Sequence, residues 1–333
     1  MLVEHSNRPL VTVAVPAYNG EKFVESCLKN IGLQTYENIE VIVSDNCSLD
    51  ETFSEIRKNI VSISGARCIR TSANLGAISN INYLLRHARG KFFVIWALDD
   101  NKPPNFIEEC VKSFEVNPEA VLCIPRIEMS LVSTGKLIAI FQTKIPVELK
   151  TPCSRFQFTL NNVPATAFYG LYNKQALNKL GWIPRKLAGD LAYLQGLSLL
   201  GDFVYSPSAT FEFKIRDKWN TSVDDLKFFY GSEIPPISRF AFLSFYIESG
   251  KFVWDSGHSV AIKVKCYKLL VIHFVKTKLQ RVFLKLLSVI LTNKVGKKMA
   301  INFYFKYLDS DYTEVRDAKL FESRIILPVL RYW

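Results

Sequence analysis

The chain has 333 residues, 49% of them hydrophobic, which is ample material for a packed core and excludes a disordered protein. Its 7 cysteines form no Cys-x-x-Cys pair and its 4 histidines form no His-x-x-x-His pair, so we expect reduced, mostly buried thiols and no zinc hydrolase site. The net charge is +11, but ten Lys or Arg and no Asp or Glu lie between His258 and Lys298, which leaves only +1 for the rest.

The first half of the chain alternates short β-branched runs with helical patterns. Leu10–Val15 predicts a buried strand that stops at Pro16, and apolar residues at helical spacing predict a helix over Glu21–Gln34. Further strands are predicted over Ile39–Ser44, Ala66–Arg70, Lys91–Trp96 and Ala120–Ile124, with helices near Leu49–Lys58 and over Gly76–His87 and Asn105–Val116. This alternation predicts an α/β fold, with a Rossmann-like, mostly parallel sheet flanked by helices.

The second half has a weaker pattern. Residues 126–215 are mixed, with a hairpin predicted around Thr134-Gly135. From about Arg216 the chain is aromatic, basic and predicted to be helical. We therefore divide the chain into a domain over 1–222, made of a half over about 9–125 and a half over about 126–222, and a helical C-terminal region over 223–333.

Two adjacent carboxylates, Asp99 and Asp100, follow the strand predicted over Lys91–Trp96. Sheets of this class bind ligands at the carboxyl ends of their strands. Adjacent carboxylates are costly there unless they are solvated or paired with a cation, and a Mg²⁺ or Mn²⁺ ion that chelates a diphosphate suits them. The alternative is a solvated loop that caps the next helix.

Polar residues also end the neighbouring strands. Asp45 is placed to accept a hydrogen bond from a base or ribose, or else to cap the helix that follows. After the first strand, Pro16 fixes a turn and Tyr18 can cover a planar base, or simply pack. Gly76 permits close approach of the backbone to a ligand, while the asparagines around it, Asn74 among them, are alternatively helix caps.

Four segments together resemble a known family. They are Val11-Thr-Val-Ala-Val-Pro-Ala-Tyr-Asn19, Val43-Ser-Asp45, Asn74-Leu-Gly76 and Leu98-Asp-Asp-Asn-Lys-Pro-Pro104. In order and spacing they are similar to the nucleotide-binding half of the family 2 glycosyltransferases, which have the GT-A fold. The resemblance covers roughly Leu10 to Ser222.

The resemblance implies a role for each matched position. The turn formed by Pro16, Ala17, Tyr18 and Asn19 would hold the base together with Asp45, and the Asn74–Gly76 segment would also belong to the nucleotide site. Asp99 would hold the ribose, and Asp100 would ligate a divalent metal, Mn²⁺ or Mg²⁺, that bridges the diphosphate. Many members have a further Asp where this chain has Ala97, which weakens the expectation of metal dependence.

Inverting transfer needs a carboxylate that takes a proton from the acceptor hydroxyl. Asp190, at the start of an apolar helical pattern, is the candidate, with helix capping as the alternative role. The family usually has an acidic residue or Ser before this Asp, where the chain has Gly189. Further on, the family often has a His near the diphosphate, and Lys214 or Arg216 would supply positive charge here instead.

The basic segment 258–298 contains no apolar run of the ~20 residues needed to span a bilayer. On a helix, Lys278, Arg281 and Lys285 share one face and aliphatic residues cover most of the rest. Such a helix suits the surface of an anionic membrane, or alternatively packs against the catalytic domain. Basic residues that alternate with bulky aliphatics fit nucleic acid poorly.

We therefore expect an inverting glycosyltransferase that uses a nucleotide-sugar donor, a UDP-sugar first of all, and a glycan or lipid-linked glycan acceptor in cell-surface polysaccharide synthesis. Because Met1–Arg8 has no apolar run of signal-peptide length, we expect it in the cytoplasm, peripheral at the inner face of the plasma membrane. The alternative is a non-catalytic nucleotide-binding or scaffold member of the same fold. A dehydrogenase or phosphate-loop kinase is excluded by the missing glycine motifs.

Overall fold

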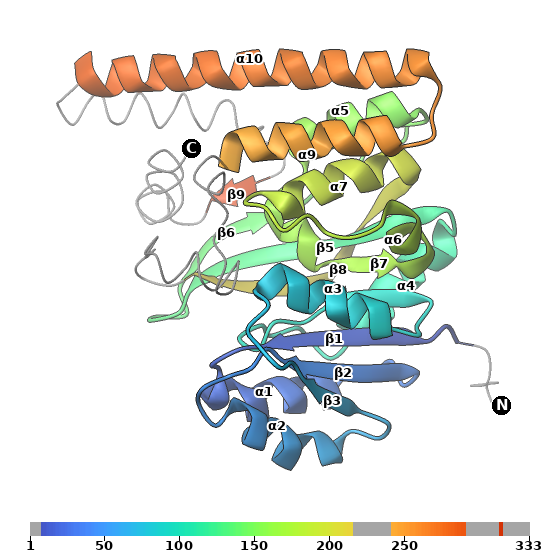
Figure 1. The fold of residues 1–333 in the computed structure, drawn as a ribbon, viewed down its shortest axis with the longest axis vertical. Coiled ribbons are helices and arrows are strands. Elements are labelled where there is room, and N and C mark those ends of the chain that lie inside the picture. Colours follow the sequence, from blue (N-terminus) through green and yellow to red (C-terminus); the bar gives the residue numbers. More distant parts are fainter. Residues whose placement is uncertain (1–7, 216–240, 291–312, 316–333) are drawn as a thin grey trace.

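The computed structural model describes residues 8–215, 241–290 and 313–315, with side chains in the C-terminal helix described up to Leu279 (Figure 1). Its strands are β1 (Val11–Ala17), β2 (Ile39–Asp45), β3 (Arg67–Arg70), β4 (Phe92–Ile95), β5 (Ala120–Leu131), β6 (Leu137–Phe141), β7 (Leu171–Asn173), β8 (Asp202–Ile215) and β9 (Thr313–Val315). Its helices are α1 (Glu21–Gly32), α2 (Thr52–Asn59), α3 (Ala77–His87), α4 (Phe106–Val116), α5 (Pro152–Asn162), α6 (Lys174–Leu180), α7 (Gly189–Leu200), α9 (Ala241–Asp255) and α10 (Val260–Ile290).

The strands form one sheet in the order β3-β2-β1-β4-β7-β5-β6-β9, and β8 pairs with β5. The pairs β1–β2, β1–β4 and β2–β3 are parallel, as the βαβ pattern predicts. The short strand β7 is antiparallel to both of its neighbours, β4 and β5, and joins the two halves of the domain into one sheet. The predicted α/β class is confirmed.

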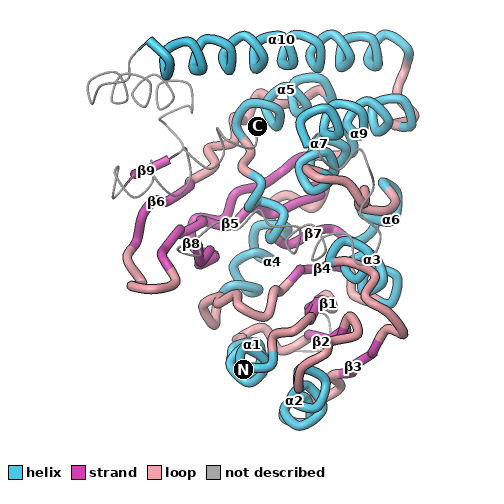
Figure 2. The backbone as a smooth tube through the Cα atoms, turned by 60° about the vertical axis from the view of Figure 1, so that its left-hand side comes forward, coloured by secondary structure: helices cyan, strands magenta, loops and turns pink. Residues whose placement is uncertain are grey.

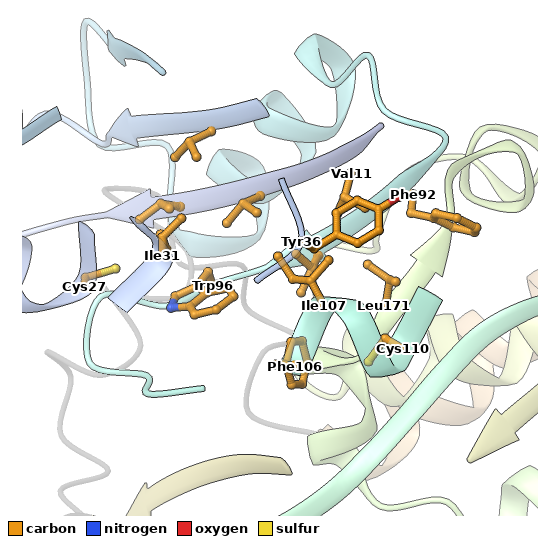
Figure 3. Packing of buried hydrophobic residues seen from close by; sticks show 14 of the residues in the cluster. Val11, Cys27, Ile31, Tyr36, Phe92, Trp96, Phe106, Ile107, Cys110 and Leu171 are labelled. Atoms are coloured by element: carbon orange, nitrogen blue, oxygen red, sulfur yellow. The ribbon is translucent and has the colours of Figure 1, made fainter. Parts of the chain in front are cut away.

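Alternation along the strands sends side chains to two helical layers. Val11, Val13 and Val15 of β1 pack in a cluster with α1, α2 and α4, whereas Ala14 packs in a cluster with α3, α5, α6 and α7. Figure 2 shows these helices on the two sides of the strands, and Figure 3 shows the first cluster, including Trp96 against Phe106. β1, β2 and β4 are therefore covered on both faces, which explains why nearly all of their residues are buried.

The second half of the sheet contains two long strands. The hairpin predicted around Thr134-Gly135 is confirmed, but its first strand, β5, runs on from the predicted Ala120–Ile124 to Leu131. β8 extends from Asp202 to Ile215, because it pairs in parallel along β5. An isolated bridge between Asn101 and Glu212 brings β8 next to the loop that follows β4.

The C-terminal helices stack on the second helical layer, and α10 lies along the edge of the molecule beyond α9 (Figure 1). Cys266 and Leu270 of α10 are buried in a small cluster with Phe156 of α5 and Leu199 of α7. None of the helices in the described ranges has the length and apolar character needed to cross a bilayer. All seven cysteines are free thiols, and four of them are buried, as expected.

Candidate functional site

The predicted site residues of the first half lie at one edge of the sheet. Ala17 at the end of β1 is in register with Asp45 at the end of β2, and the Ala17 carbonyl accepts a hydrogen bond of 2.8 Å from the Asn46 amide. On the other side of β1, Ala14 pairs with Ile95, so β4 ends at the same edge. The turns that follow the three strands are therefore neighbours.

The Pro16–Asn19 turn holds two loops together. Asn19 has a left-handed backbone, with φ 45°, and its Oδ1 accepts a hydrogen bond of 2.9 Å from the Leu49 amide, while its own amide donates to Ser48 Oγ at 2.9 Å. The Ala17 side chain is buried, and the Tyr18 ring is partly exposed. Tyr18 is thus the side chain of this turn that is free to cover a ring, whereas Asn19 shapes the loop.

Asp45 is fully buried at the end of β2. Its Oδ2 lies 3.2 Å from Nε of Arg70 on β3, and its Oδ1 accepts a bond of 3.3 Å from the Ser48 amide. The alternative role as a cap of the following helix does not apply, because α2 begins at Thr52, whose amide donates to Asp50. Asp45 is instead an anchored carboxylate at the edge where β1, β2 and β4 end, and Arg70 is a partner that the sequence did not indicate.

Asn46 connects the β2 end with the segment before α3. Its Nδ2 donates to Asn74 Oδ1 at 2.8 Å, and its Oδ1 accepts from the Leu75 amide at 2.9 Å. Asn74 Oδ1 also accepts from the amide of Gly76, which has φ 81°, so glycine is required there for conformation. Asn74 therefore shapes the turn. Asn46 was passed over in prediction, although its place directly after Asp45 was a signal.

Asp99 and Asp100 differ sharply in exposure. Asp99 is exposed, whereas the Asp100 side chain is 9% exposed and its Oδ2 accepts from the Ala97 amide and from Lys102 Nζ, each at 3.2 Å. Burial raises the pKa of Asp100, the Lys102 ammonium lowers it, and the Asp99 charge raises it. The alternative of a loop that caps the next helix does not apply, because α4 begins six residues later, at Phe106.

Asp190 lies in the first turn of α7. Its Oδ1 accepts a hydrogen bond of 2.8 Å from the Leu191 amide, and burial raises its pKa above the ordinary value for an aspartate. Gly189 leaves no room for a side chain, since a Cβ there would lie 2.2 Å from the Pro184 carbonyl oxygen. This close approach accounts for glycine where relatives are expected to have an acidic residue or Ser.

Tyr169 is a buried residue whose pKa responds to Asp190 and to the pair Asp99 and Asp100. This tyrosine ends a short 3-10 helix before β7 and packs on Phe211 of β8. Its pKa is raised by burial first and then by the charges of Asp100, Asp190 and Asp99. Charges from both halves of the domain therefore act on the buried Tyr169 hydroxyl, a residue that sequence reasoning did not single out.

The carboxylates fit a cation that is shared with a diphosphate. Among the described residues there is no group of three or more His, Cys, Asp or Glu that could hold a metal by themselves. Mg²⁺ and Mn²⁺ sites of nucleotide enzymes commonly use one or two protein carboxylates and take the remaining ligands from the phosphates. Asp100 Oδ1, which accepts no hydrogen bond from a described residue, would supply one such ligand.

Some residues of the sequence predictions lie outside the described part of the chain. Lys214, near the end of β8, is exposed, whereas Arg216, the other residue expected to supply positive charge to the diphosphate, is not described. Residues 1–7, which belong to the N-terminal segment without a predicted signal peptide, also lie outside the described residues, as do residues 291–298 of the basic segment.

Comparison with known proteins identifies the family of the chain. The model of the glycosyl transferase family 2 matches residues 12–181, about half of the chain, so the chain belongs to this family. The S. aureus TarS 1-349 structure in complex with UDP-GlcNAc has the same fold, with a TM-score of 0.56 at 19% identity over 79% of this chain and 72% of that one. The expected family and its GT-A fold are confirmed.

Curated relatives match over shorter stretches. An uncharacterized glycosyltransferase of Haemophilus influenzae is 37% identical over 111 residues, which are 33% of this chain and 34% of the relative. The hyaluronan synthase of Pasteurella multocida is 29% identical over 136 residues, or 40% of this chain and 14% of that enzyme. The chain thus spans about a third or less of the length of these relatives.

Proposed function

We propose that the chain is an inverting glycosyltransferase that moves a sugar from a nucleoside diphosphate, a UDP-sugar first of all, to a glycan or lipid-linked glycan in cell-surface polysaccharide synthesis. The observation that carries the proposal is the common edge at which β1, β2 and β4 end, which brings together the turns that hold Tyr18, Asp45 and Asp100. Binding of UDP-GlcNAc by TarS and the glycan-synthase names of two relatives support the donor and acceptor classes.

The donor would lie across the ends of β1, β2 and β4. Tyr18 would cover the base, Asp45 and its Arg70 partner would accept and donate hydrogen bonds at the base, and Asp99 would hold the ribose. Asp100 would hold a divalent cation together with the diphosphate. When bound, this cation supplies positive charge to the leaving diphosphate.

Asp190 would act as the general base. Its free carboxylate oxygen takes the proton from the acceptor hydroxyl while that oxygen attacks the anomeric carbon, and the nucleoside diphosphate departs from the opposite face. The bond from the sugar to the diphosphate breaks as the bond to the acceptor forms, so the configuration inverts. The raised pKa of Asp190 makes its ionised form a stronger base.

The test is the Asp190→Asn variant, assayed for sugar transfer and, by calorimetry, for UDP binding. We expect transfer to fall by about a thousandfold, as for loss of a general base, with UDP affinity unchanged. The control is Asp255→Asn, an exposed carboxylate at the end of α9. Unaltered transfer in the Asp190→Asn variant would rule out this base.

A second function, a non-catalytic nucleotide-binding scaffold, is favoured by Ala97, which replaces a carboxylate of the usual family pattern. A scaffold binds UDP-sugar without releasing UDP. Incubating the purified chain with UDP-sugars and Mn²⁺ and measuring free UDP distinguishes the two, since a slow hydrolysis of the donor is expected only of the enzyme.

The two roles considered for the basic segment, packing against the catalytic domain and contact with a membrane, fit opposite faces of α10. The inner face packs on α5 and α9 through Cys266 and Leu270, whereas Val271 and Ile272 are 61% and 54% exposed. The exposed lysines of this helix are Lys265, Lys268, Lys276 and Lys278. We propose that the outer face rests on an anionic membrane at the cytoplasmic side, where lipid-linked acceptors lie.

Sedimentation with phosphatidylserine vesicles tests the membrane surface. A Lys265→Gln, Lys268→Gln, Lys276→Gln variant is expected to lose most of its vesicle binding and to keep UDP affinity, because each lysine near the surface contributes about 1 kcal/mol. Equal sedimentation of the variant and the parent chain would remove the membrane role.

A further inference from the structure

A lysine side chain is buried directly beneath the proposed donor site. Lys102 is 0% exposed, and its Nζ lies 3.2 Å from Asp100 Oδ2. Three aromatic rings surround the ammonium, with Nζ 4.4 Å from the centre of Trp96, 4.5 Å from Phe211 and 5.6 Å from Phe106. None of the roles described above uses this charge.

A buried ammonium is costly unless it is paired, and here two kinds of partner offset the cost. Asp100 supplies the opposite charge, and the ring faces of Trp96 and Phe211 attract a cation within about 6 Å. The rings come from three different segments, because Trp96 follows β4, Phe106 begins α4 and Phe211 lies in β8. The cage is therefore built by the tertiary fold.

The backbone of Lys102 is fixed as firmly as its side chain. Its amide donates to Asn30 Oδ1 at 3.0 Å, and its carbonyl accepts from Asn30 Nδ2, also at 3.0 Å. The backbone of Lys102 is thus held from α1, while its side chain is held by Asp100 and the three rings. The ammonium touches no ligand directly, and any effect on the donor must pass through Asp100.

The two carboxylate oxygens of Asp100 differ in their hydrogen bonds. Oδ2 accepts from both Lys102 and the Ala97 amide, and no donor among the described residues contacts Oδ1. In addition, Ala97 removes a carboxylate from the pattern usual in the family, so both features make this site less negative. The charges of Asp99, Asp100 and Lys102 together amount to −1 instead of −2.

We propose that Lys102 is a positioning residue that acts as a permanent counter-cation of Asp100, presenting Oδ1 to the donor and making donor binding depend less on a divalent metal. This inference rests on the proposed function, since it assigns a partner to its metal ligand. A cation at Asp100 competes with a positive charge that is already in place, and its affinity is lowered accordingly.

The test measures Mn²⁺ binding to the full chain in the presence of UDP, by electron paramagnetic resonance of free Mn²⁺, with no turnover involved. Lys102→Gln, which keeps a donor to Asp100 but removes the charge, is expected to tighten Mn²⁺ about tenfold, the effect of losing one like charge at a partly screened site. UDP affinity in chelator should fall by a similar factor. Lys112→Gln, an exposed lysine of α4, is the matched control and should change neither quantity.

A double-mutant cycle separates positioning from general stability. In an Asp100→Asn background, Lys102→Gln should no longer change Mn²⁺ affinity, because its effect passes through the carboxylate. Lys102→Met provides a second uncharged variant, and melting curves show which variants are folded. Unchanged or weaker Mn²⁺ binding in a folded Lys102→Gln or Lys102→Met protein would overturn the inference, whereas failure of the parent chain to bind UDP would contradict the proposed function itself.

Discussion

Arg70 Nε lies 3.2 Å from Oδ2 of Asp45. The two side chains differ greatly in exposure: that of Arg70 is 43% exposed and that of Asp45 is 0% exposed. The guanidinium also donates to the Ser48 carbonyl at 2.9 Å and lies over the Phe53 ring. Arg70 therefore connects β3, the loop after β2 and helix α2, and shields a carboxylate at the edge proposed to bind the nucleotide.

Replacing Arg70 by Met is expected to weaken UDP binding about tenfold, because Asp45 loses the partner that fixes its orientation. Breaking a partly exposed ion pair of this kind also lowers the free energy of unfolding, by about 1–2 kcal/mol. Isothermal titration with UDP and chemical denaturation measure the two effects.

Arg67 on the same strand provides the matched control. It pairs with buried Glu40 at 3.4 Å, and Glu40 keeps Arg89 as a second partner. Arg67→Met should lower stability and leave UDP affinity unchanged. Equal losses of UDP affinity in both variants would mean that Arg70 acts on the fold alone.

The pH profile of transfer should reflect Asp190. Burial raises the pKa of this carboxyl, and a general base must be ionised, so the rate should fall as the pH drops through a value above the ~3.9 of an ordinary Asp. Steady-state rates between pH 4 and 8, with UDP binding followed in parallel, measure this. An acid limb at the ordinary value for Asp would contradict the assignment.

Asp190→Asn is also expected to stabilise the protein. A raised pKa means that folding favours the protonated carboxyl, so this stabilising contribution is present at low pH and is lost as the pH rises through the folded-state value. Removing the charge should raise the free energy of unfolding at neutral pH by about 1 kcal/mol, the usual size for relieving a strained active site. Denaturation at neutral and at acid pH should show the difference between variant and parent shrinking toward acid.

Gly189→Ala should disturb the start of α7. The added Cβ would lie 2.2 Å from the Pro184 carbonyl oxygen, so the backbone must shift, and Asp190 with it. We expect a loss of about 2 kcal/mol in the free energy of unfolding and a fall in transfer. Gly32→Ala, whose Cβ would meet Ile63 at an ordinary 3.9 Å, serves as the control and should be tolerated.

Asn46→Ala should weaken UDP binding several-fold, because the Leu75 amide and Asn74 Oδ1 both lose their contact with the β2 end. A buried group left unpaired costs about 1–3 kcal/mol, and part of that appears as lower stability. The comparison variant is Asn161→Ala, an exposed residue that donates within α5. If both alanine variants bind UDP like the parent, Asn46 is not part of the site.

The strand ends were predictable because each strand is a buried β-branched run that stops at polar residues. Pro16, Asp45 and Asp99 therefore lie where the pattern placed them. Lys102 was not predictable, since a lysine in a Pro-rich turn is expected in solvent and the ring that completes its cage, Phe211, is more than a hundred residues away. The same limit applies to Tyr169, whose packing on Phe211 joins segments that are distant in the sequence.

The sequence of α10 could not predict which of its faces packs against the rest of the protein. Its sequence alternates lysines with aliphatics, so both a core face and a surface face can be drawn on it. Only the packing of Cys266 and Leu270 on α5 and α7 selects the inner one. The surroundings of Asp190, at the start of a predicted helix, likewise depended on contacts with Pro184 that no local pattern encodes.

The position of β7 has a consequence for how the domain can be divided. This strand of three residues, Leu171–Asn173, lies between β4 and β5 in the sheet. In the sequence it follows residue 125, the predicted boundary between the two halves, and so belongs to the second half. A fragment cut at that boundary would leave the fully buried strand β4 as a bare edge, open to pairing with other chains and to aggregation. The halves are thus not separable modules, and expression fragments should extend beyond β7.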